Sequence, residues 1–169
     1  PDASRGKPER TGMFTSGIVS VVGSHRVALF FTGRKHAGEN LADVLARRSQ
    51  ELAAPIQMCD ALAANTSPPL RTILANCLSH ARRCYVDVIA DFPEECRFVL
   101  ETLREVYHND QIARQRGLSA EERLAFHQAE SAPHMKSLED WMRAQFEERK
   151  TEPNSGLGEA IQYTQKHWP

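Results

Sequence analysis

Ile73-Leu-Ala-Asn-Cys-Leu-Ser-His-Ala-Arg-Arg83 is the stretch around which the rest of the chain is organised. Its apolar residues predict a buried strand from Arg71 to Cys77, followed by a helix that Ser79 caps and that runs to about Ala90. The polar residues of the stretch would then lie in the first helical turn, at the carboxyl end of the strand. Open α/β sheets have their functional sites at the carboxyl ends of the strands. The stretch therefore predicts an α/β fold with a functional site here.

Three side chains of this stretch are candidates for that site: His80, Arg82 and Arg83. The Cys-x-x-His spacing lacks the second ligand pair of a structural zinc site, so we do not expect zinc. Two adjacent arginines on a helix usually belong to a solvated face. A buried structural role for all three side chains is a further alternative to a functional one.

Length and composition limit the class of protein. The 169 residues, 41% of them hydrophobic, fit one domain with or without an insertion. No apolar run approaches the roughly 20 residues of a membrane helix, and the amino terminus is not signal-like. We therefore expect no membrane association and a cytoplasmic location. The four cysteines lack zinc-ribbon spacing, so we expect reduced thiols that pack in the core.

The charges are unevenly distributed along a chain whose net charge is −1. Residues 1–90 hold 11 basic and 7 acidic side chains, whereas residues 91–150 hold 9 basic and 13 acidic ones. A polyanion should therefore prefer the first part. The acidic second part is better suited to packing or to contact with protein.

The first half of the chain predicts a hairpin, a helix and a short strand. Residues 13–22 and 26–32 are β-branched and apolar, and Gly23-Ser24 between them suits a type II′ turn. A loop at 33–39 carries Arg34 and Lys35, which could contact phosphate or form a solvated face. A helix at 40–48 follows.

A short strand at 55–60 ends in Asp60, and a loop is expected at 61–69. An aspartate at the carboxyl end of a strand can hold a divalent cation such as Mg²⁺. The alternative is that Asp60 serves only as a cap or turn residue.

The second half is predicted to be helical throughout. A stripe at helical spacing predicts a helix over about 94–114; its residues are Cys96, Val99, Leu100, Leu103, Val106 and Tyr107. Ser119-x-x-Glu122 is a capping box that opens a helix to about Glu130, and Pro133 starts another. A linker at 152–156 precedes a last short helix.

Cys77-Leu-Ser-His-Ala-Arg-Arg83 resembles the Cys-x-x-His-x-Arg-Arg signature of bacterial transposases of the insertion-sequence-66 family, and Cys84-Tyr-Val-Asp87 continues it. The stretches 117–123, 131–141 and 160–168 are similar to later helical segments of that family. The resemblance covers most of the chain from about Thr11 onward, in the right order.

The resemblance implies a ribonuclease-H-like core with a helical insertion. The expected division is a partial core at 1–90, a helical insertion at 91–152, and a linker with a helix returning toward the core at 153–169. Enzymes of this Asp-Asp-Glu type hold two Mg²⁺ (or Mn²⁺) ions between three carboxylates and displace phosphodiesters. Their partner is double-stranded DNA at the transposon ends and the target, and we expect a homo-oligomer in a bacterial cytoplasm.

The resemblance also assigns roles to individual residues. Asp60 corresponds to the second catalytic aspartate and metal ligand, and His80 would lie near it to hold a phosphate or orient Asp60. Arg82 and Arg83, together with Arg34 and Lys35, would contact DNA.

We expect this chain to be the middle of a transposase, inactive alone, because the family's first acid precedes the hairpin and its glutamate follows the last helix. The family usually has an aromatic residue soon after the aspartate, whereas this chain reads Asp60-Ala-Leu-Ala-Ala-Asn65. A helical protein-interaction module or an inactive transposase remnant are the alternatives.

Overall fold

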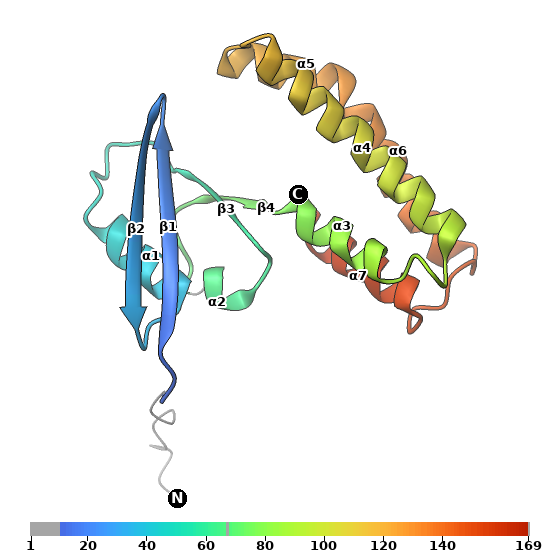
Figure 1. Ribbon diagram of the computed structural model, residues 1–169, viewed down its shortest axis with the longest axis horizontal. Helices are drawn as coiled ribbons and strands as arrows, with labels where there is room; N and C mark the ends of the chain where they lie inside the picture. The colour runs from blue at the N-terminus through green and yellow to red at the C-terminus, as the bar shows by residue number, and fades with distance from the viewer. Residues whose placement is uncertain (1–10, 67, 169) are drawn as a thin grey trace, which may run out of the picture. The chain divides into compact units, whose positions relative to one another are not determined.

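The computed structural model describes residues 11–66 and 68–168, which form a mixed α/β protein, as expected. The chain divides into two compact units, residues 1–76 and residues 77–169. The first unit holds the strands, and the second is helical (Figure 1). Within the described ranges, no helix combines the length and the apolar character that crossing a membrane requires.

The first unit begins with a long hairpin. Strands β1 (Phe14–Val22) and β2 (His25–Gly33) pair antiparallel along their full length, from Phe14 opposite Gly33 to Val22 opposite His25. Gly23 has a φ of +58°, whereas Ser24 is not among the residues with positive φ, which is the pattern of a type II′ turn. The predicted hairpin and its turn are therefore confirmed.

Helix α1 (Ala37–Ala46) packs on β1. It starts three residues earlier than the sequence predicted, because His36 and Glu39 form a capping box that satisfies the first turn. The amide of Asn40, which is buried, donates to Ser16 Oγ of β1 at 3.2 Å. The rings of Phe14 and His36 lie 4.3 Å apart, so α1 is fixed to one end of the hairpin.

Strands β3 (Ile56–Cys59) and β4 (Ile73–Asn76) form a separate parallel pair. The prediction of a loop between them is wrong in part, because residues 63–66 form the one-turn helix α2 (Ala63–Thr66). The prediction that β4 is buried is also wrong, since Ile73 is 58% exposed. Its partner Ile56 is 72% exposed on the same face, so no described residue of the first unit forms a layer over this face.

Five helices make up the described part of the second unit, residues 77–168 (Figure 1). They are α3 (Leu78–Asp87), α4 (Pro93–Gln115), α5 (Ala120–Glu130), α6 (Ala132–Glu147) and α7 (Gly156–Lys166). Helix α4 packs against α3, α5 and α6, while α7 packs against α3 and α6. The predicted capping box of α5 is present, with Glu122 N donating to Ser119 Oγ at 3.2 Å.

The core of the second unit includes Cys96, Val99 and Leu103 of the stripe that the sequence predicted over 94–114. Its buried members are Tyr85, Cys96, Val99, Leu103, Leu138, Met142, Leu157, Ala160 and Ile161. Burial raises the pKa of the Tyr85 phenol, whose hydroxyl donates to the sulfur of Met142 at 3.5 Å. No disulfide joins the four cysteines, but only Cys96 is fully buried.

Two details of the predicted helices need correction. Helix α3 begins at Leu78 with Cys77 in the extended N-cap conformation, so Ser79 lies inside the first turn and is not the cap. Tyr107, predicted in the buried stripe of α4, is instead exposed, and its hydroxyl lies 3.1 Å from that of Ser79. This contact joins the start of α3 to α4.

The break between the two units falls between Asn76 and Cys77, fourteen residues before the expected end of the core at residue 90. Helix α3 belongs to the helical unit because its buried residues, Ala81 and Tyr85, face α4 and α7. The three domains at 1–90, 91–152 and 153–169 remain a prediction about the complete protein.

Replacing Leu138 by alanine should destabilise the helical unit by about 2 to 5 kcal/mol, because the side chain is 1% exposed and its removal leaves a cavity. The matched control is Leu124→Ala on α5, where the side chain is 61% exposed and the expected change is within about 0.5 kcal/mol. Urea unfolding followed by far-ultraviolet circular dichroism measures both. Equal midpoints for the two variants would contradict this core assignment.

Candidate functional site

Asp60 directly follows the last residue of β3, as the sequence predicted. The end of β3 lies at the same edge as the end of β4, because the strands are parallel and Cys59 is paired with Asn76. Helix α3 begins two residues after Asn76. Asp60 and the stretch that opens the helical unit therefore both follow the carboxyl ends of neighbouring parallel strands.

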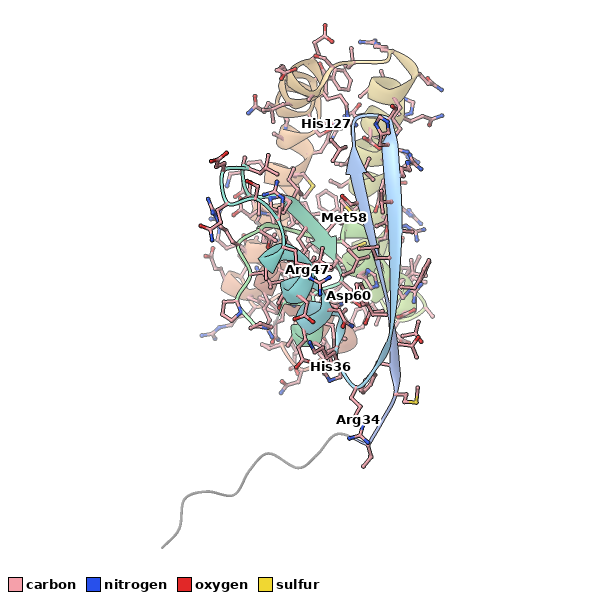
Figure 2. All side chains as sticks on the ribbon, turned by 90° about the vertical axis from the view of Figure 1, so that its left-hand side faces the viewer. Arg34, His36, Arg47, Met58, Asp60 and His127 are labelled. Atoms are coloured by element: carbon pink, nitrogen blue, oxygen red, sulfur yellow. The ribbon has the colours of Figure 1, made fainter. Side chains whose placement is uncertain are left out.

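The carboxylate of Asp60 is held through one of its oxygens. Oδ1 accepts a short hydrogen bond from the side-chain amide of Asn65 and a second one, at 3.3 Å, from the backbone N–H of Leu62. Within the described part of the chain Oδ2 accepts no hydrogen bond and forms no ion pair. Asp60 therefore does serve as a turn residue, and it keeps one oxygen available. Asp60 is labelled in Figure 2.

Asn65 is a residue of this site that the sequence reasoning missed. Its backbone carbonyl accepts from Gln57 Nε2 at 2.9 Å, and Gln57 Oε1 accepts from Thr72 Oγ1 at 2.9 Å. These bonds link α2 to β3 and to the residue before β4. The available signal was an Asp followed five residues later by an Asn, a spacing too common to single out a site.

The residues at hand fit a divalent-cation centre only in part. Among residues 11–66 and 68–168 no group of three His, Cys, Asp or Glu side chains could hold a metal ion. The carboxylate of Asp60 is the right type of ligand for Mg²⁺ or Mn²⁺, which prefer oxygen. It can fill one coordination position, and a two-ion centre would need further carboxylates.

Arg34 and Lys35 directly follow β2, so they lie at the other end of the hairpin from its turn. Arg34 is labelled there in Figure 2, close to His36, and its side chain is exposed. Lys35 is exposed as well and pairs with Asp43 of α1. The two predicted DNA contacts thus lie together on the surface, although Asp43 offsets the charge of Lys35.

His80, Arg82 and Arg83 are all exposed on α3. Their side chains form no hydrogen bond or ion pair with any residue that the structure describes. The alternative of a buried structural role therefore does not apply to them. They belong to the helical unit and Asp60 to the first unit, so the closeness of His80 to Asp60 remains a prediction.

A second polar cluster lies in the helical unit. His127 Nδ1 lies 2.9 Å from Ser131 Oγ, and Arg123 donates to Asp110 at 2.8 Å. Asp110 also pairs with Arg114. Helix α5 has no buried residue, and the bond from Arg123 to Asp110 joins it to α4. A pocket of about 440 Å³ adjoins the cluster and is lined by His127, Ser131, Met135, Lys136 and Trp168, among others.

Comparison with known proteins gives a consistent result. The uncharacterized protein y4jD of Sinorhizobium fredii is 43% identical over 109 residues, which cover 62% of this chain and 19% of that protein. The matched part thus spans about a fifth of the length of this curated relative. No solved structure matches the chain.

A family model described as "Transposase IS66 family" matches residues 9–169, which is nearly the whole chain and includes every candidate residue discussed above. The signature around His80 predicted this family. The chain belongs to the IS66 family of transposases.

Proposed function

We propose that this chain is the central part of the catalytic domain of a DNA transposase of the Asp-Asp-Glu type. The complete protein would cut and join DNA strands during transposition of an insertion sequence, and this chain alone would be inactive. The observation that carries the proposal is the position of Asp60, at the carboxyl end of a parallel strand in a member of a transposase family.

The arrangement of the strands supports a ribonuclease-H-like core. An antiparallel hairpin, a helix and a parallel strand pair follow one another in the order that such a core requires. Within the described residues, β1 pairs only with β2 and β3 only with β4. One further strand of the complete protein, placed between β1 and β3, would join the two pairs into a single mixed sheet.

Asp60 would be one of three carboxylates around Mg²⁺ or Mn²⁺, and the other two would come from outside this chain. When bound, such ions activate the attacking oxygen and stabilise the leaving oxygen of a phosphodiester. The part of Asp60 is to offer Oδ2 while Asn65 and Leu62 hold Oδ1. The nearby turn thus orients the carboxylate.

The exposed basic residues would bind the DNA of the transposon ends and the target. Arg82 and Arg83 have no acidic partner in the described ranges, so their charge is available to backbone phosphate. Arg34 and Lys35 would extend this contact, and the exposed imidazole of His80 could hold a phosphate near Asp60. Transposition complexes of this type would contain more than one copy of the protein.

Replacing Asp60 by asparagine in the complete transposase should reduce cleavage of a transposon-end duplex by at least about 100-fold, because a charged ligand oxygen is lost. DNA affinity should stay within about threefold, since Asp60 makes no proposed phosphate contact. Gel assays of cleavage and of DNA binding measure the two effects.

The matched control is Asp91→Asn, an exposed aspartate that follows α3 and lies outside the proposed site, which should cleave at the wild-type rate. Wild-type cleavage by the Asp60 variant would exclude Asp60 from the active site.

Replacing both Arg82 and Arg83 by glutamate should weaken DNA binding by the complete protein. If each arginine neutralises one phosphate, the slope of log affinity against log salt should also fall by about 2. Fluorescence anisotropy at several salt concentrations measures both effects.

The control is the same double reversal at Arg97 and Arg104 of α4, which pair with Glu94 and Glu105. Unchanged affinity and slope in the Arg82 and Arg83 variant would remove these residues from the DNA contact.

A helical interaction module is the second candidate function. One observation favours it: the core of the helical unit lies wholly within residues 77–169. An inactive remnant is the third, because the residues after Asp60 depart from the family pattern. Full transposition by the Asp60 variant would favour the module, and no cleavage by the intact wild-type protein would favour the remnant.

A further inference from the structure

Helix α2 is a single turn that buries none of its residues. It packs against α1, but an isolated turn of four residues is unstable in water. Hydrogen bonds add to this contact, and most of them pass through Asn65. This makes Asn65 the residue on which the local structure after β3 depends.

Both the side-chain amide and the backbone carbonyl of Asn65 form hydrogen bonds. Its side-chain amide donates to Asp60 Oδ1, and its backbone carbonyl accepts from Gln57 Nε2 at 2.9 Å. The amide nitrogen must face Asp60, because an ionised carboxylate offers acceptors only. Gln57 is in turn fixed by the hydroxyl of Thr72, at 2.9 Å. The chain of bonds thus runs from the residue before β4, through β3 and α2, to the carboxylate.

All four residues of this chain of bonds are half-buried, so water competes only partly for their hydrogen bonds. The bond from Asn65 and the bond from Leu62 N–H both end on Oδ1. They restrict rotation of the carboxylate and leave Oδ2 as its open oxygen. A ligand that is oriented before the ion arrives loses less entropy on binding.

We propose that Asn65 is the positioning residue of Asp60 and that Gln57 supports it from β3. The inference rests on the proposed role of Asp60 as a metal ligand, and adds to it the residue that orients the ligand. Asn65 lies within the segment after Asp60 where the family's usual aromatic residue is absent. The amide would give this chain its own means of fixing the carboxylate.

The experiment uses the complete transposase with Mn²⁺ alone as the probe. Electron paramagnetic resonance of free Mn²⁺ gives the affinity of the ion site without any need for turnover. Replacing Asn65 by alanine should weaken the binding that depends on Asp60 by on the order of 10-fold, as loss of a partner that orients a ligand usually does. The Mn²⁺ concentration that half-saturates cleavage should rise by the same factor.

Two further variants separate positioning from simple folding of α2. Asn65→Gln keeps an amide donor and should recover most of the affinity. Thr66→Ala alters the next residue of α2, whose hydroxyl donates, among the described residues, to the carbonyl of Ala63 alone. This variant should bind Mn²⁺ as the wild type does. Near-wild-type affinity for Asn65→Ala would overturn the proposal, as would equal losses in the alanine variants of Asn65 and Thr66.

The variant Asp60→Asn distinguishes the positioning role of Asn65 from the proposed role of Asp60 as a metal ligand. If that variant keeps its Mn²⁺ binding and its cleavage, the assignment of Asp60 fails and the role of Asn65 fails with it. If it loses both while Asn65→Ala behaves as the wild type, Asp60 stands as a ligand and only the positioning role is rejected.

Discussion

The parallel pairing of β3 with β4 is the constraint on which the geometry of the candidate site depends. Parallel strands need a connection that returns to the starting edge, and here residues 60–72 make that return. The pairing of Cys59 with Asn76 places the ends of both strands at one edge. Asp60 and the start of α3 follow those two ends, so one hydrogen-bonded register sets where both candidate segments begin.

Local patterns in the sequence predicted much of the fold, because local physics determines those elements. Gly23 and Ser24 specify their turn through backbone conformation, and Ser119 with Glu122 specifies a helix start through two reciprocal hydrogen bonds. The apolar stripe of α4 marks the face that packs in the core. Each of these signals lies within a few residues of the element that it determines.

The features that the sequence did not predict depend on residues outside their own local pattern. Ile73 is apolar and was expected to be buried, but burial depends on a covering layer that the residue itself does not encode. Helix α2 is too short to show a period. Of the candidate site, Asp60 and the exposed arginines were predicted, whereas Asn65 was not, because its importance comes from its bonds to Asp60 and to Gln57 of β3.

The exposed apolar face of the β3–β4 pair affects how the two units would behave in solution if they were separated. Ile56 and Met58 are 72% and 73% exposed, and apolar surface in water costs roughly 25 cal/mol per Å². The helical unit buries its own core, whereas the described strands leave apolar side chains exposed beside edges that pair with no other described strand. This combination favours association with other chains. Proteolysis that separates the two units should therefore yield a helical fragment that does not aggregate and a strand-containing fragment that does.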